Sequence, residues 1–203
     1  YGICLFSADT LQDFLKQRKI RKRKLLSLFQ KDKELYLDTQ KEGIWVPLVQ
    51  INYANYMIKL AGQDEPFDEE WEQKIDYDGF NLEIKDGLWI SAIEQFEPLE
   101  SGEYHAEAEE IYIARSSNVE HCRSPHERWF KTRDGNINYT DIKYDVPDGK
   151  YLLSVKGYVR KEPLAFPAPN CGFFFSLTKV EAFKGFKNPR ESEDYDFNIG
   201  SMK

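Results

Sequence analysis

The sequence has few cysteines and no long apolar run. Only three of its 203 residues are cysteine, namely Cys4, Cys122 and Cys171, and they lie far apart in the chain. This odd and widely spaced set does not indicate a disulfide framework and favours a reducing compartment, so we expect a cytoplasmic protein. No apolar stretch approaches the roughly 20 residues that cross a bilayer, and we therefore expect no membrane segment.

The sequence also lacks the local motifs of common active sites. It has no glycine-rich phosphate loop, no Gly-x-Ser-x-Gly nucleophile elbow and no His-Glu-x-x-His zinc helix. One cluster of candidate zinc ligands is present, since His121, Cys122 and His126 lie within six positions. Structural zinc sites usually show paired motifs, and a catalytic zinc needs three well-spaced ligands and an open position. A metal-dependent hydrolase at these residues is therefore an alternative to the leading interpretation, a protein without catalysis or cofactor.

Basic residues are fewer than acidic ones, and their distribution is uneven. The chain has 28 Lys and Arg against 35 Asp and Glu, which gives a formal net charge of −7. Residues 1–50 carry a net charge of +4, residues 51–110 carry −14, and residues 111–203 carry +3. Because general nucleic-acid binding draws most of its affinity from phosphate contacts, the overall sign argues against that function.

A basic run, RKIRKRK at residues 18–24, places six positive charges in seven positions. It interrupts the apolar stripe of a helical region over residues 7–33, so either two short helices meet there or one helix projects a charged middle. Residues 34–51, in which Gly43 lies between β-rich arms, predict a hairpin. A helix followed by a hairpin resembles a winged helix, so a DNA-associated regulator is an alternative function. We expect the basic run to be exposed.

The rest of the chain shows strand patterns separated by turns. Apolar and polar residues alternate over residues 80–84, and Asp86 with Gly87 supplies a hairpin turn. A turn at residues 146–149 leads into a further strand, and residues 171–183 predict a closing strand.

The intervening segments are less regular. Residues 103–116 are a candidate strand, residues 118–139 read as a polar connector, and three prolines place residues 163–169 in a loop.

These patterns together predict a mainly β fold, an antiparallel β-sandwich with a short N-terminal helical segment and hairpin. The predicted organisation is an appendage of helix plus hairpin over residues 1–48, a β-sandwich domain over residues 49–186 and a polar tail over residues 187–203.

The acidic middle third is the most uneven feature of the chain. It contains 17 carboxylates and only three basic groups. This composition predicts a negative surface that speeds docking to a basic partner. A plain solubility surface is the alternative. Trp71 and Tyr77 lie among these charges, as aromatic residues do in protein-binding surfaces. The predicted partner-binding residues are Asp68, Glu69, Glu70, Trp71, Glu72, Tyr77, Tyr104, Glu107, Glu109 and Glu110.

Three motifs around the acidic segment resemble the competence-protein-J family, intracellular inhibitors that accompany a competence-associated nuclease. The stretch INYANY at residues 51–56 is similar to the opening strand of that family, and VPDGKY at residues 146–151 is similar to its later turn. Trp71 and the pair Gly79-Phe80 are similar to its acidic segment. The resemblance covers residues 50–184 and implies a small β domain that inhibits a nuclease or another toxin without catalysis.

We therefore expect a cytoplasmic immunity or inhibitor protein that neutralises a basic toxin or nuclease. In this interpretation aromatic anchors supply affinity, and the carboxylates supply steering and selection against wrong partners. No cofactor, metal or membrane takes part.

Overall fold

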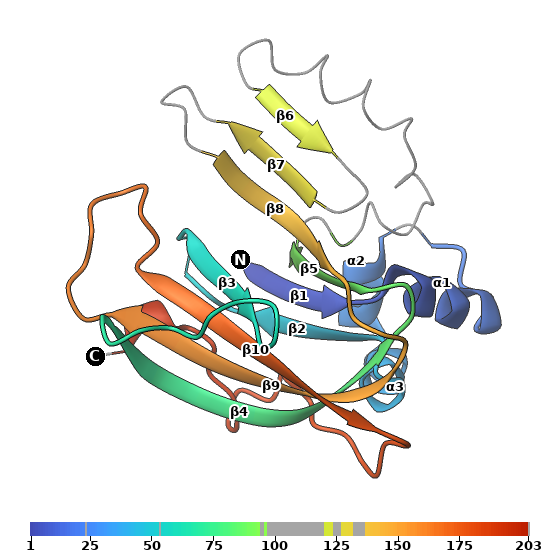
Figure 1. Cartoon of the computed structure of the whole chain (residues 1–203). Coiled ribbons are helices and arrows are strands. Elements are labelled where there is room, and N and C mark those ends of the chain that lie inside the picture. Colours follow the sequence, from blue (N-terminus) through green and yellow to red (C-terminus); the bar gives the residue numbers. More distant parts are fainter. Residues whose placement is uncertain are drawn as a thin grey trace.

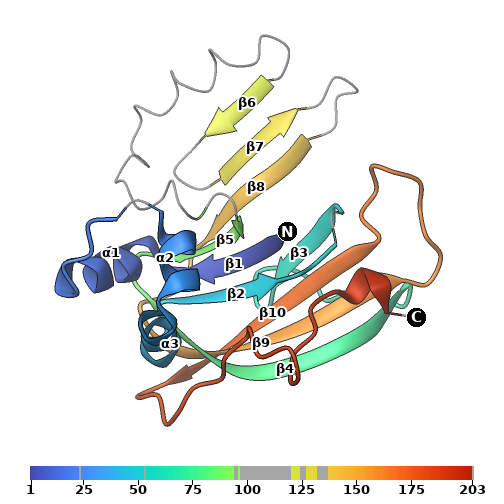
Figure 2. The same cartoon turned by 180° about the vertical axis from the view of Figure 1, so that it is seen from behind.

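The chain forms two β-sheets and a layer of helices in a computed structural model (Figures 1 and 2). The structure describes residues 1–22, 24–52, 54–93, 96, 120–123, 127–131 and 137–202. The helices are α1 (Ala8–Gln17), α2 (Leu25–Lys31), α3 (Lys33–Glu42) and the short η3 (Ile199–Ser201). The strands are β1 (Gly2–Phe6), β2 (Trp45–Val49), β3 (Tyr56–Leu60), β4 (Trp71–Ile84), β5 (Leu88–Ala92), β6 (Glu120–Arg123), β7 (Glu127–Lys131), β8 (Ile137–Tyr144), β9 (Gly149–Arg160) and β10 (Cys171–Val180).

The strands divide into a six-stranded sheet and a four-stranded sheet. The first has the order β2-β1-β5-β8-β7-β6, and all its pairs are antiparallel. The second has the order β3-β10-β9-β4, in which β3 runs parallel to β10 and the other pairs are antiparallel. The predicted mainly β sandwich is confirmed, with one parallel pair that the turn patterns did not indicate.

The core of the sandwich lies between the two sheets. Phe80, Leu82 and Ile84 of β4 are each no more than 1% exposed, so the alternation over residues 80–84 is confirmed. Leu5 of β1 and Leu153 of β9 lie in the same buried cluster, which shows that both sheets contribute to it. This alternation follows from strand geometry, because successive side chains of a strand point to opposite faces.

A second core lies on the outer face of the six-stranded sheet, beneath the helices. Phe6 and Trp45 project from β1 and β2 into this cluster, where Phe14 of α1 and Phe29 of α2 join them. The ring of Trp45 stacks on Phe96 with centroids 4.5 Å apart. The molecule is therefore a sandwich with a third, helical layer.

The hairpin predicted over residues 34–51 is wrong, because most of its first half belongs to helix α3. The side chain of Asp32 accepts a hydrogen bond of 3.0 Å from the amide of Leu35 and so caps the start of the helix. Gly43 ends the helix in the left-handed conformation, with φ of 70°. The sequence contained both signals, since Asp is a preferred N-cap and Gly a preferred C-terminal residue, but the β-rich composition outweighed them.

Both terminal segments are part of the sandwich, whereas an N-terminal appendage and a polar tail were predicted. Strand β1 lies inside the six-stranded sheet between β2 and β5, although residues 1–48 were expected to form a helix and a hairpin. In the segment expected as a polar tail, Phe197 and Ile199 are at most 2% exposed and belong to the sandwich core.

The turns and the polar connector had different outcomes. Asp86 and Gly87 both have positive φ, 54° and 83°, so the predicted turn is confirmed. The hairpin expected there is wrong, because the turn leads from β4 in the four-stranded sheet to β5 in the six-stranded sheet, and these two strands do not pair. The connector predicted over residues 118–139 is wrong, because that segment contains β6, β7 and the start of β8. The candidate strand over residues 103–116 lies outside the described residues.

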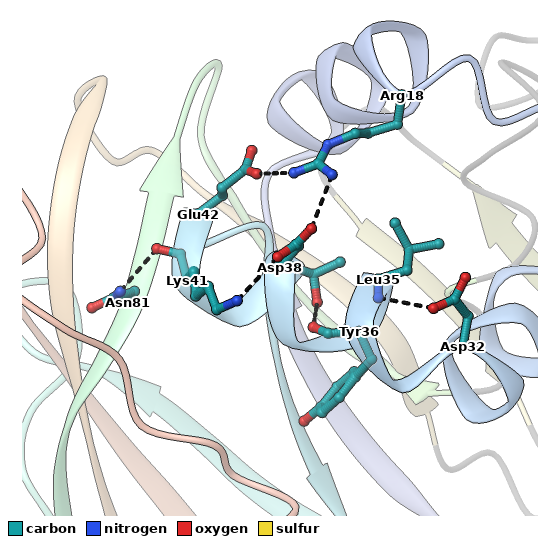
Figure 3. Close-up of polar contacts among 9 residues, drawn as sticks. Arg18, Asp32, Leu35, Tyr36, Asp38, Lys41, Glu42 and Asn81 are labelled. Atoms are coloured by element: carbon teal, nitrogen blue, oxygen red, sulfur yellow. Dashed lines mark hydrogen bonds and ion pairs between the residues drawn. The ribbon is translucent and has the colours of Figure 1, made fainter.

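The basic run separates α1 from α2, so two short helices meet there. Its described members Arg18, Lys19, Arg21, Lys22 and Lys24 are exposed, as predicted. Arg18 nevertheless has partners within the protein, because its guanidinium donates to Asp38 at 2.9 Å and to Glu42 at 2.5 Å, both on α3 (Figure 3).

Candidate protein-interaction surface

The described part of the predicted acidic surface lies at one end of the four-stranded sheet. Residues 65–70 form the loop that enters β4, and Trp71 is the first residue of that strand. Tyr104, Glu107, Glu109 and Glu110 lie outside the described residues.

The structure pairs two of the predicted carboxylates, and two others on β4, with cations of the same molecule. Glu70 forms an ion pair of 2.6 Å with Arg160 of β9, and Glu72 forms one of 2.9 Å with Lys74. Asp76 and Asp78, farther along β4, pair with Lys156 at 3.4 Å and with Lys187 at 2.7 Å. The sequence separates these opposite charges by up to 109 positions, and the fold brings them together.

The two aromatic residues of the predicted site that the structure describes, Trp71 and Tyr77, pack against neighbouring side chains. Trp71 is 7% exposed, and the guanidinium of Arg160 lies 4.5 Å from the centre of its ring. Tyr77 is half-buried, with edge-on contacts to Tyr195 and Phe197 at centroid distances of 5.2 and 5.5 Å. These contacts show that both rings take part in the packing of the four-stranded sheet.

Asp68 and Glu69 remain exposed near the end of the acidic loop (residues 65–70), just before β4. Within the described part of the chain neither forms an ion pair, and Asp68 accepts a hydrogen bond of 3.0 Å from the amide of Glu70. These two carboxylates are therefore the part of the predicted site that the structure leaves open to a partner.

Phe67 fixes the acidic loop to the outer face of the four-stranded sheet. Its ring stacks on Tyr158 with centroids 4.6 Å apart and lies against Trp71 at 4.7 Å. The ring also covers Gly172, where a Cβ atom would clash with it. The ammonium group of Lys59 lies 4.8 Å from the centre of the Phe67 ring and donates to the carbonyl oxygens of residues 65 and 66 at 2.9 and 3.2 Å. Asp68 and Glu69 are thus presented by an anchored backbone.

A second loop, residues 161–170 between β9 and β10, projects from the end of the sheet where the acidic loop enters β4 (Figures 1 and 2). Asn170 holds its base, because its side chain accepts from the amide of Leu164 at 2.8 Å and donates to the carbonyl of Leu164 at 2.9 Å. Asn55 donates to the carbonyl of Pro167 at 2.8 Å. These contacts give the loop a defined conformation in addition to the restriction that its prolines impose.

This second loop carries the most exposed large apolar side chain of the described residues. Phe166 is 81% exposed and Leu164 is 48% exposed. The sequence predicted a loop here, which is confirmed, but assigned it no function. The available signal was a phenylalanine between Pro163 and Pro167 in a segment that cannot join a strand.

Contacts at their bases join the two loops at the same end of the sheet. The amide of Lys161 donates to the carbonyl of Glu70 at 2.9 Å. Arg160, at the end of β9, pairs with Glu70 and also donates through Nε to the carbonyl of Pro169 at 3.4 Å. We define the sheet-end surface as Asp68, Glu69, Glu162, Leu164 and Phe166.

The other predicted sites are only partly described. His121 and Cys122 lie on β6, and His126 lies outside the described residues. Among the residues that the structure does describe, no three or more His, Cys, Asp and Glu side chains are grouped to hold a metal ion.

Comparison of the chain with protein-family models, with curated proteins and with solved structures finds no match. Within the described ranges, no helix is long and apolar enough to cross a membrane.

Proposed function

We propose that this protein is a non-catalytic binding module for a basic protein partner, in the manner of an immunity or inhibitor protein. The observation that carries the proposal is the anchored loop that presents Asp68 and Glu69 to solvent at the end of the sheet from which the loop with the exposed side chain of Phe166 also projects. Exposed carboxylates attract a basic protein over a range of about 10 Å at moderate salt, and an apolar group supplies the contact that follows.

Ion pairs at the neighbouring carboxylates weaken the attraction of a basic partner and restrict its source to fewer residues. Glu70 and Glu72 are largely neutralised by Arg160 and Lys74, so they add little to the field outside the molecule. Steering is therefore expected from Asp68 and Glu69, with Glu65 and Glu162 nearby on the same two loops. A toxin or nuclease is one class of basic partner, and the resemblance to the competence-protein-J family favours it.

Charge reversal tests the proposal. The full chain is used to isolate its binding protein, and association of the purified pair is then measured by stopped flow from low to high salt. The variant Asp68→Lys with Glu69→Lys is expected to slow association about tenfold or more at low salt, with the difference disappearing at high salt.

The matched control is Glu181→Lys with Glu193→Lys, which changes the net charge equally at exposed residues outside the sheet-end surface. Equal association rates for the two double variants would show that Asp68 and Glu69 serve solubility and do not steer a partner.

A further inference from the structure

We propose that the loop of residues 161–170 is the anchor of the interface, and that it inserts Phe166 into an apolar pocket rimmed by basic side chains on the partner protein. This inference rests on the proposed function, and it identifies which side chain supplies the affinity and what shape the partner presents to it.

The exposure of Phe166 is the first step. A large aromatic side chain that is 81% exposed gains little from folding, so the folded monomer does not account for its position. Phe183 and Phe186, by comparison, lie near Lys150 and Lys41 at centroid distances of 5.4 and 5.7 Å. Phe166 is the only large apolar side chain among the described residues with more than 70% exposure.

The conformation of the loop is the second step. The paired hydrogen bonds between Asn170 and Leu164 close the loop as backbone bonds close a hairpin. The bond from Asn55 to Pro167 ties the residue after Phe166 to the segment before β3. A loop already held in one conformation loses less conformational entropy on binding, so more of the contact energy of Phe166 appears as affinity.

The surrounding charge is the third step, and it selects a basic protein over an anionic membrane. Glu162 is exposed within the loop, and Asp68 and Glu69 are exposed on the adjacent loop. Lys161 is the exposed cation among them. Because the net negative charge at this end of the sheet is repelled by anionic lipid headgroups and attracted by lysine and arginine, the surface fits a pocket with basic side chains around it.

Photo-crosslinking tests the inference. The full chain is prepared with the photoreactive residue benzoylphenylalanine at position 166, and separately at position 186 as a control. Phe186 is also exposed, at 39%, and lies beyond the opposite end of β10. Illumination in the native host is expected to attach the partner at position 166 and not at position 186. The attached peptide is expected to line an apolar pocket flanked by Lys or Arg.

Affinity measurements with the purified partner complete the test. Phe166→Ala is expected to weaken binding about 30-fold or more through faster dissociation, whereas Phe186→Ala leaves it unchanged. A partner that binds the wild type but attaches only at position 186, or that binds Phe166→Ala equally well, overturns this inference and leaves the proposed function standing.

Two further outcomes are distinguishable. If no purified protein binds the chain, the proposed function and this inference fail together. If vesicles containing phosphatidylserine bind the wild type and not Phe166→Ala, the loop is a membrane anchor, and the assignment to a protein pocket is overturned.

Discussion

The guanidinium of Arg160 lies 4.5 Å from the centre of the Trp71 ring, and the two residues face each other across the β4–β9 pair. The same guanidinium pairs with Glu70 and donates to the carbonyl of Pro169, so a single side chain joins the acidic loop, the sheet and the projecting loop. The side chain of Arg160 is 16% exposed, which weakens the screening of these contacts by solvent.

Removal of this junction is expected to destabilise the protein. Arg160→Ala loses the stacking on Trp71 and the ion pair with Glu70, and should lower the free energy of unfolding by about 1 to 2 kcal/mol. Arg160→Lys keeps the charge but not the planar stacking, so about half of the loss is expected. Urea denaturation measures both variants. Equal stability of Arg160→Ala and the wild type would contradict a structural role.

Phe67 and Phe166 are expected to respond in opposite ways to truncation. Phe67→Ala removes a ring packed on Tyr158 and Trp71, and should cost about 2 kcal/mol of unfolding free energy and expose residues 61–70 to proteolysis. Phe166→Ala, at an exposed position, should change stability by no more than about 0.5 kcal/mol. Thermal denaturation and limited proteolysis distinguish the two. A large loss of stability in Phe166→Ala would mean that this ring packs within the protein.

A side chain at position 43, in place of Gly43, is expected to destabilise the folded protein. Gly43 adopts φ of 70°, and a Cβ atom there would lie 2.9 Å from the amide nitrogen of Glu83. Gly43→Ala should therefore cost about 1 to 3 kcal/mol. Gly185→Ala is the matched control, because no atom lies within 4 Å of its Cβ position, and it should be nearly neutral. Chemical denaturation of both variants gives the comparison, and equal effects would show that the turn after α3 can rearrange.

Tyr56 is expected to make stability depend on alkaline pH. Burial of its side chain raises the pKa of Tyr56 to about 12, while a tyrosine in the unfolded chain titrates near 10. The folded state then holds the proton more tightly, so this contribution to stability is complete below pH 10 and is lost as the pH rises toward 12.

Tyr56→Phe isolates that contribution and keeps the ring that stacks on Phe173 at 5.4 Å. The wild type should lose stability relative to Tyr56→Phe by up to about 1.4 kcal/mol per pH unit above pH 10. Denaturation curves from pH 9 to 12 provide the measurement, and Tyr139→Phe at an exposed tyrosine is the control. Parallel curves for the wild type and Tyr56→Phe would contradict the expected slope.

Several elements of the fold were readable from local patterns. The alternation in β4, the positive-φ turn at Asp86-Gly87 and the strand after the turn at residues 146–149 each depend on neighbouring residues, and each is confirmed. The hairpin expected at Asp86-Gly87 is wrong, because whether two successive strands pair in one sheet is decided by the tertiary structure. The hairpin prediction over residues 34–51 failed because β propensity depends strongly on context, and the capping residues Asp32 and Gly43 decided the outcome.

The candidate site was predicted less completely than the fold. Local composition identified Asp68 and Glu69, but it grouped them with Glu70 and Glu72, whose cations the fold supplies. It also counted Trp71 as a binding residue, although Arg160 and Phe67 cover that ring. Phe166 was missed because exposure is a property of the folded surface, and a single loop phenylalanine has no periodic pattern that marks it.

The sequence by itself determined the mainly β class, the main turns and the excess of negative charge in the middle third, because these depend on local periodicity, turn chemistry and composition. Only the tertiary structure decided which carboxylates remain unpaired and which aromatic ring faces solvent. Ion pairs such as Lys187 with Asp78 form between residues 109 positions apart, so the charge that a partner meets is set by strand pairing and by the return of the chain, not by the order of residues.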